Sequence, residues 1–307
     1  MYFPYLRGKT YELAVLDDCI ELIQRKEQIV PIIEPVKKDV SGLTNKLIRY
    51  VQRGMPIILI TNPKVGELSS KPDEILDIVA PKLDENGSSH ILGFIITEKT
   101  SAQDIHSFIN RTMQNKVCFI HAFEYIDPRV FDGHENIEFH IFINGKADLS
   151  YQRKFIEPQK IIIEDGFTVQ TKNALYPNDE NFSELNKNYQ QLGYMGFGDY
   201  LIVGKDFKLK GGPAYAVVIH ITYQKETGGI GIRHFVSDRT DTDKDTAGKF
   251  LEALSKLMAE KNKNSKIIQT MAMNKYSNLF DRRHFPNLGY VKKLSMEHHI
   301  ELMATLI

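Results

Sequence analysis

Short apolar runs alternate with segments of helical spacing along the first two thirds of the chain. The runs consist mainly of Ile, Val, Leu and Phe, and they cover residues 2–6, 29–36, 55–63, 90–97, 116–123, 137–145, 160–167 and 193–204. Apolar positions recur at helical spacing in residues 10–28, 41–54, 69–86, 101–115 and 181–192. Thr10 is the expected N-cap of the first helix, with Glu12 in its first turn. The pattern predicts strands that alternate with helices.

Strands that are apolar on both faces are typical of a parallel sheet covered by helices. Eight strands joined by right-handed crossovers predict a closed (β/α)8 barrel of the TIM type. The alternative is an open doubly wound sheet. That fold usually carries a glycine-rich phosphate turn after its first strand, and the corresponding residues 7–10, RGKT, hold one glycine.

The pattern changes after residue 204. Residues 211–226 and 229–238 alternate as antiparallel strands do, and Thr227, Gly228 and Gly229 supply the turn between them. Residues 246–262 form an amphipathic helix, and residues 295–307 a further helix or strand. No linker rich in Pro, Gly or Ser precedes these elements. We therefore expect a barrel core over residues 1–204 and, over 205–307, a β-hairpin and helices packed on the same domain.

Composition and charge narrow the class of protein. The 39 basic residues balance the 39 acidic ones, so net charge does not indicate nucleic-acid binding. No apolar run approaches the roughly 20 residues of a membrane span, and the first residues lack the apolar core of a signal peptide. Cys19 and Cys118 are far apart and in apolar contexts, which favours buried thiols over a disulfide. We expect a cytoplasmic protein without a membrane partner.

Three short motifs resemble those of the Beta-protein family, bacterial proteins often encoded on mobile elements and near defence genes. They lie in MYFPYLRGKTYELAVL, IVPIIEPV and GFGDYLIVG, and the resemblance extends over residues 1–260. The matching positions are Tyr2, Pro4, Arg7, Lys9, Glu12, Pro31, Ile32, Ile33, Glu34, Gly198, Asp199 and Tyr200. The resemblance implies a barrel-like fold, a role in phage defence and a partner encoded nearby, commonly nuclease-like. It implies no known reaction.

Polar side chains follow the predicted strands, and a closed parallel barrel brings all these strand ends to one face. They are Arg7, Lys9, Glu34, Asn62, Glu98, His121, Glu124, Asn144, Glu164, Asp165, Asp199 and Tyr200. Such a rim suits a phosphorylated or otherwise anionic ligand and acid/base chemistry. The alternative is that Arg7 forms a structural ion pair with Glu34 or Asp199.

Two carboxylates are the candidate catalytic residues. Prolines on both sides of the strand in PIIEP restrain the backbone at Glu34, and Gly196 and Gly198 beside Asp199 permit close approach by a ligand. The expected ligand-binding residues are Arg7, Lys9, Asn62, His121, Glu164 and Tyr200. A hydrogen-bonded core imidazole is the alternative for His121, and a turn cap is the alternative for Asp199.

Other motifs are incomplete, and no cofactor is identified. His298 and His299 are adjacent, and adjacent helical side chains point about 100° apart, so we expect no metal site there. Lys208, Lys210, Gly211 and Gly212 lack the P-loop pattern, and the Arg282–His284 cluster is too small to indicate single-stranded nucleic acid. Two functions remain open, a barrel enzyme acting on an anionic, nucleotide-like ligand and a non-enzymatic sensor or partner-binding subunit.

Overall fold

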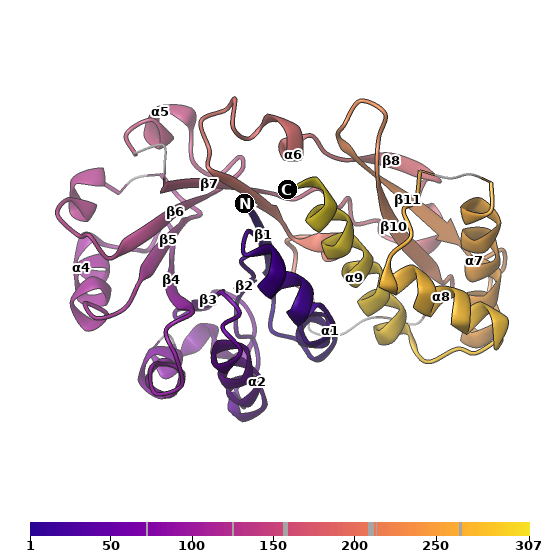
Figure 1. Ribbon diagram of the computed structural model, residues 1–307, viewed down its shortest axis with the longest axis horizontal. Coiled ribbons are helices and arrows are strands. Elements are labelled where there is room, and N and C mark those ends of the chain that lie inside the picture. The colour runs from indigo at the N-terminus through magenta and orange to yellow at the C-terminus, as the bar shows by residue number, and fades with distance from the viewer. Residues whose placement is uncertain (72, 125, 156–158, 208–211, 213, 264–265) are drawn as a thin grey trace. The chain divides into compact units, whose positions relative to one another are not determined.

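The computed structural model describes residues 1–307 except 72, 125, 156–158, 208–211, 213 and 264–265 (Figure 1). The chain forms two compact units, each assembled from separate segments. The first, the barrel unit, comprises residues 1–9, 20–165 and 188–200, and the second comprises residues 10–19, 166–187 and 201–307. The last division, between Tyr200 and Leu201, falls near the boundary expected after residue 204, whereas residues 10–19 and 166–187 belong with the C-terminal segment.

Eight parallel strands close the barrel, which confirms the predicted fold class. Their order around the barrel is β1-β2-β3-β4-β5-β6-β7-β9. The first and last strands are neighbours, with Phe3 opposite Gly198, as the strand count predicted. The strands are β1 (Tyr2–Leu6), β2 (Ile32–Ile33), β3 (Ile57–Ile60), β4 (His90–Ile96), β5 (Val117–His121), β6 (Ile137–Ile143), β7 (Lys160–Glu164) and β9 (Gly196–Asp199).

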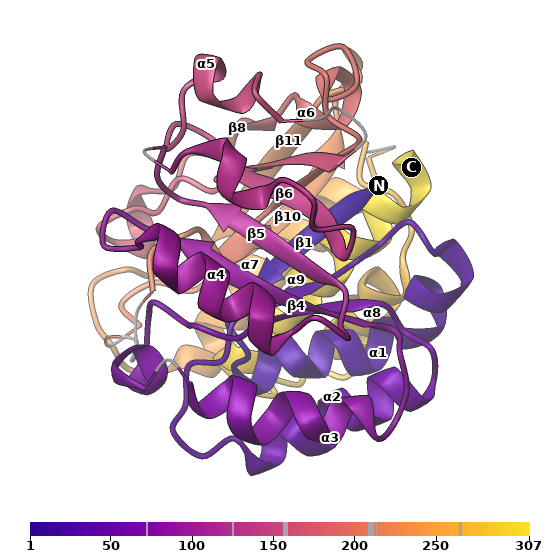
Figure 2. The ribbon, with the colours of Figure 1, turned by 90° about the vertical axis from the view of Figure 1, so that its left-hand side faces the viewer.

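Helices follow most of the barrel strands, and α2, α3 and α4 lie outside the barrel wall (Figures 1 and 2). The helices before β7 are α1 (Thr10–Lys26), α2 (Ser41–Gln52), α3 (Ala80–Asp84), α4 (Ala102–Arg111) and α5 (Leu149–Gln152). Lys9, rather than the expected Thr10, occupies the N-cap position of α1. The helix expected over 69–86 is present but shorter, because a π-helical segment (Ile75–Val79) runs directly into α3. Pro81 lies in the first turn of α3 and has no N–H to donate, and the wider π-helical turns lie just before it.

Alternate residues of the strands fill the barrel interior. Phe3 and Tyr5 of β1 pack there with the inward-facing Ile and Phe residues of the other strands and with Tyr200. Gly198 stands directly beside β1, where an added Cβ would lie 2.0 Å from the Phe3 carbonyl oxygen. The glycines of GFGD therefore admit a neighbouring strand, and not the ligand for which they were expected to leave room.

The second unit contains an antiparallel sheet of order β10-β11-β8. The predicted hairpin is confirmed as β10 (Val218–Gln224) and β11 (Ile230–Val236), and β8 (Asp179–Ser183) pairs with β11. The helix expected over 181–192 is therefore wrong at its start. Pairing with β11 draws Asn181–Ser183 into a strand, and α6 covers only Leu185–Asn188. The remaining helices are α7 (Thr246–Lys261), α8 (Met271–Asp281) and α9 (Leu288–Leu306).

The sheet of the second unit has its own apolar core. Ile219 and Ile221 of β10 pack with Phe250 and Leu254 of α7 and with Leu294 of α9, and all five are buried. The described helices of either unit include none that is both long and apolar enough to cross a membrane.

Candidate functional site

Glu34 lies at the carboxyl end of β2 and accepts three hydrogen bonds inside the barrel mouth. Its Oε2 accepts from the Tyr5 hydroxyl (2.8 Å) and from the Arg7 guanidinium, and its Oε1 accepts from the backbone N–H of Lys64 (2.8 Å). The Glu34 side chain is 1% exposed and that of Arg7 is 12% exposed. The ion pair that was the alternative for Arg7 is therefore present, with Glu34 as its partner. Both residues come from strand ends on the same face of the barrel.

Two tyrosine rings flank the Arg7 guanidinium. Its central carbon lies 4.9 Å from the centroid of the Tyr5 ring and 5.4 Å from that of Tyr200. Burial, followed by the charge of Glu34, raises the pKa of Tyr5 well above its ordinary value, so this hydroxyl remains a donor to Glu34. Arg7 is thus fixed by a carboxylate and two aromatic faces.

Asp199 does not share this mouth with Arg7 and Glu34, which corrects the expectation of one common cluster. Its Oδ1 accepts a hydrogen bond of 2.9 Å from the hydroxyl of Tyr2, whose ring also packs on Phe197. Side chains alternate across a strand, and Tyr200, next to Asp199, faces the interior. Asp199 therefore points to the outer side of the barrel wall.

The other expected ligand-binding residues lie at the same face in different surroundings. The amide of Asn62 is buried and bonds both backbone groups of Ile95, with distances of 3.0 and 2.8 Å. Glu164 ends β7 and accepts a bond of 3.3 Å from Asn144, and Lys9 precedes α1. Asn62 therefore joins β3 to β4, and it also lines a pocket.

A polar pocket of about 370 Å³ lies at the carboxyl ends of β3 and β4. Its described lining residues are Thr61, Asn62, Lys64, Asp73, Leu76, Phe94, Thr97, Lys99, Thr100, Asp104, Ser107, Phe108 and Arg111. We call it the β3/β4 pocket. Of these residues, the sequence pattern predicted only Asn62. Lys64 and Lys99 lie in loops after the strand ends and Arg111 lies in α4, where strand periodicity does not mark them.

The acidic groups of the β3/β4 pocket already have partners. Asp73 binds Arg111 at 2.7 Å, and Asp104 accepts from the backbone N–H and hydroxyl of Ser101 in a capping box. Among the described residues, neither Lys64 nor Lys99 has an ion-pair partner within 4.0 Å. Desolvation lowers the pKa of Lys64, although the charges of Glu34 and Asp104 oppose that shift. The pocket thus offers two cations to an incoming anion.

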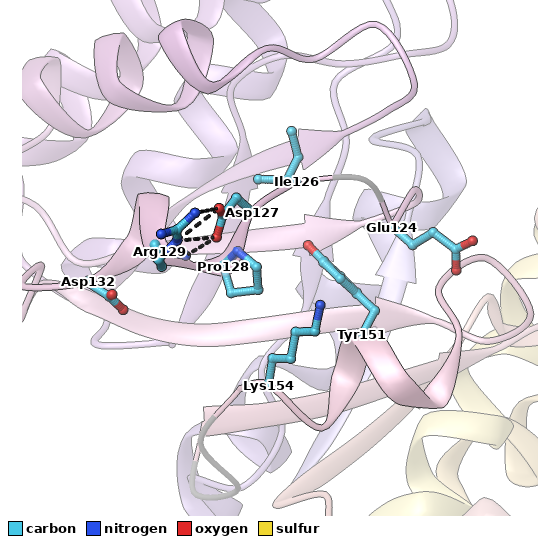
Figure 3. Close-up of a pocket in the computed structure, with 8 residues that line it drawn as sticks. All are labelled: Glu124, Ile126, Asp127, Pro128, Arg129, Asp132, Tyr151 and Lys154. Atoms are coloured by element: carbon cyan, nitrogen blue, oxygen red, sulfur yellow. Dashed lines mark hydrogen bonds and ion pairs between the residues drawn. The ribbon is translucent and has the colours of Figure 1, made fainter.

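A second and larger pocket, of about 700 Å³, lies beyond the carboxyl ends of β5 and β6 (Figure 3). Its described lining residues are Glu124, Ile126, Asp127, Pro128, Arg129, Asp132, Tyr151 and Lys154. We call it the β5/β6 pocket. Asp127 and Arg129 pair with each other, and Glu124 accepts a bond of 2.7 Å from the backbone N–H of Asp148 at the start of α5.

His121 connects to the β5/β6 pocket through Tyr151. Its Nδ1 lies 3.0 Å from the Tyr151 hydroxyl and its Nε2 lies 3.0 Å from Nδ1 of His140. Both imidazoles are buried on the outer side of their strands, among Phe131, Phe142 and Phe155. His121 is therefore a hydrogen-bonded core imidazole, one of the two alternatives. The alternation in IEFHIFI places His140 opposite the inward-facing residues of β6, a signal that the sequence analysis did not use.

Because the imidazoles of His121 and His140 are buried, we expect the protein to lose stability in acid. Burial lowers the pKa of His140 to about 3 and lowers that of His121 well below its ordinary value. The unfolded chain takes up these protons below about pH 6.5 and the folded chain does not, so stability is complete above pH 6.5 and falls toward pH 3. Between pH 7.5 and 5.0, His140 alone should cost about 2 kcal/mol in the free energy of unfolding.

Urea denaturation at the two pH values measures this loss. The His140→Phe variant should lose about 2 kcal/mol less than the wild type between them. The same substitution at the exposed His106 is the matched control and should leave the pH dependence unchanged. An identical pH dependence in the wild type and His140→Phe would contradict the assignment of a neutral, buried His140.

The remaining candidate motifs lie away from these pockets. His298 bonds the Thr222 carbonyl oxygen (2.9 Å) and the Thr270 hydroxyl (2.9 Å), and His299 bonds the Thr222 hydroxyl (2.9 Å). No group of three or more His, Cys, Asp or Glu side chains in the described part of the chain is placed to hold a metal ion. Lys208, Lys210 and Gly211 lie outside the described residues.

Comparison with known proteins adds no family name. No protein-family model matches the chain, and a search of curated proteins found none of similar sequence. The resemblance to the Beta-protein family therefore stays a prediction. What the structure does show is a closed parallel barrel whose carboxyl-end face carries a buried ion pair and two polar pockets.

Proposed function

We propose that the protein binds a small phosphorylated or nucleotide-like ligand in the β3/β4 pocket. The observation that carries this proposal is the charge balance of the pocket. Its acids, Asp73 and Asp104, are engaged by Arg111 and Ser101, while Lys64 and Lys99 have no ion-pair partner among the described residues. A phosphate group would satisfy both ammonium groups, and the hydroxyls of Thr97 and Thr100 stand in the same lining.

The position of the pocket supports the same reading. It lies at the carboxyl ends of barrel strands, where barrel enzymes bind their ligands. Its volume of about 370 Å³ falls within the range of small-molecule sites, which is about 300–1,000 Å³. The backbone N–H of Lys64 is held by Glu34, so the Arg7–Glu34 pair fixes the segment that presents the Lys64 ammonium.

The cellular setting is proposed from the resemblance. In it, the protein acts in the cytoplasm of a bacterium, in defence against phage or another mobile element. The two cysteines, Cys19 and Cys118, are free and buried, which fits a reducing compartment.

Binding of adenosine monophosphate and glucose 6-phosphate, measured by thermal shift and calorimetry, tests the proposed ligand class. A ligand at 100 times its dissociation constant stabilises the folded state by roughly 2.7 kcal/mol. Lys64→Met keeps the side-chain stem beside Phe94 but removes the charge, and it should weaken binding about 10- to 100-fold, as expected for a lost charge-assisted hydrogen bond.

Two controls make this test specific. Lys116→Met removes an exposed lysine just before β5 and should leave the affinity for both compounds unchanged. Adenosine, which lacks the phosphate, should bind far more weakly than adenosine monophosphate. If neither phosphorylated compound shifts the melting temperature, or if Lys64→Met binds them as the wild type does, the proposal is wrong and a partner-binding role becomes the better reading.

A further inference from the structure

The β5/β6 pocket holds a hydrogen-bonded chain that the proposed phosphate site does not use. The chain runs from His140 through His121 to the Tyr151 hydroxyl, with a separation of 3.0 Å at each link. His140 and His121 are buried, and Tyr151 lines the pocket. Of these three residues, only Tyr151 belongs to the described lining of the pocket.

The environment of the chain keeps its three groups uncharged. Burial lowers the pKa of both imidazoles, so they are neutral at pH 7, and burial also raises the pKa of Tyr151, so its hydroxyl keeps its proton. A neutral imidazole has one N–H donor and one bare nitrogen. If each histidine carries its proton on Nδ1, then His140 donates to His121, and His121 donates to the oxygen of Tyr151. The tyrosine proton is then free to point into the pocket.

Aromatic packing holds this geometry in place. The His121 ring stacks on Phe142 with centroids 4.6 Å apart and planes 18° from parallel, and Phe155 contacts both imidazoles. Hydrogen bonds in such a chain polarise one another, which strengthens the donor at its end. With both histidines protonated on Nδ1, Tyr151 is a pre-oriented donor and the two histidines act as positioning residues.

Lys154 stands next to this donor. It lies in the turn that follows α5, three residues after Tyr151, and both side chains point toward the space beside Pro128 (Figure 3). Among the described residues Lys154 has no ion-pair partner within 4.0 Å, although its charge acts on Asp127 and Asp148 over a longer range. One neutral O–H donor and one ammonium group are therefore presented together.

The charges of the lining select the ligand. Glu124, Asp127 and Asp132 outnumber Arg129 and Lys154, so a phosphate dianion would be repelled more strongly than a single carboxylate. We infer that the β5/β6 pocket is a second site, which binds a small 2-oxo acid with its carboxylate on Lys154 and its carbonyl oxygen on the hydroxyl of Tyr151. The Tyr151 hydroxyl donates to that oxygen as an oxyanion-hole group does.

Pyruvate labelled with carbon-13 at its carbonyl carbon is the probe for this site. On binding to the full chain, its carbonyl resonance should move to higher frequency, because a strong donor withdraws electron density from the carbonyl. Tyr151→Phe should abolish this shift and weaken binding at least tenfold, and Lys154→Met should weaken binding while the carbonyl shift of the bound fraction persists. Tyr11→Phe, which removes a hydroxyl bonded to Asn287 in the second unit, is the control and should change neither quantity.

A nitrogen-15 spectrum of the wild-type complex tests the donor chain without any substitution. With pyruvate bound, His121 and His140 should both appear as neutral rings protonated on Nδ1. Protonation of His121 on Nε2 instead would mean that Tyr151 donates to the histidine and not to the ligand, and it would overturn the inference. Failure of pyruvate to bind, or an unchanged carbonyl shift in Tyr151→Phe, would overturn it as well. None of these outcomes bears on phosphate binding at Lys64, which is measured separately.

Discussion

Replacing Glu34 by glutamine should lower the free energy of unfolding by about 3 to 5 kcal/mol, the usual cost of leaving one member of a buried ion pair alone. The carboxylate receives donors on both oxygens, the Tyr5 hydroxyl and Arg7 on one and the Lys64 N–H on the other. A glutamine amide has a single acceptor oxygen, so its NH₂ group must face a donor in either orientation. Urea denaturation of the wild type and Glu34→Gln measures the difference.

Two further variants separate the buried charge from a general effect of the substitution. Glu138→Gln breaks the surface pair between Glu138 and Lys116, which lie 2.5 Å apart, and should change stability by no more than about 1 kcal/mol. Arg7→Met combined with Glu34→Gln removes both charges and should recover part of the loss. A Glu34→Gln protein as stable as the wild type that no longer binds adenosine monophosphate would instead assign Glu34 to the ligand.

The barrel could be predicted because its strands are short, apolar on both faces and regularly spaced. The pairing of β1 with β9 followed from the number of predicted strands. The hairpin followed from the alternation of apolar and polar residues on both sides of Gly228. The strand β8 could not be predicted in this way. Residues 179–183 carry little apolar content, and their strand conformation depends on pairing with β11, about fifty residues later in the chain.

The residues at the rim of the barrel could be predicted only in part. The end of a strand shows at which end of the barrel a side chain lies, but not whether it points into the barrel or outward. Arg7, Glu34 and Asn62 continue the inward-facing positions of their strands, at two-residue intervals from Tyr5, Ile32 and Ile60. Asp199 and His121 are displaced by one residue from the inward-facing Tyr200 and Ile120, and they point outward. Deciding the side for each strand requires knowing which apolar residues fill the interior.

The residues missed at the pockets come from loops and helices, where strand periodicity carries no information. Lys64 follows a proline after β3, Tyr151 belongs to the short helix α5, and Lys154 lies in the turn after it. Their proximity to Asp104 and to His121 depends on how each loop folds back over the strand ends. The proximity of these residues depends on tertiary structure, and no local sequence pattern predicts it.

Replacing Gly198 by alanine should destabilise the barrel by about 3 kcal/mol, at the upper end of the usual cost of overpacking. The new Cβ would lie 2.0 Å from the carbonyl oxygen of Phe3, a backbone atom held by the pairing of β1 with β9, so the two strands would have to separate where the barrel closes. Thermal and urea denaturation measure the loss. Gly42→Ala, where no atom lies within 4 Å of the added Cβ, is the control and should be neutral or slightly stabilising.

At Gly196 the nearest atom belongs to the Phe3 ring, at 2.6 Å, so Phe3→Leu should partly rescue Gly196→Ala and should not rescue Gly198→Ala. Rescue of both variants by Phe3→Leu would show that side-chain crowding, and not the approach of the two backbones, requires glycine at this seam.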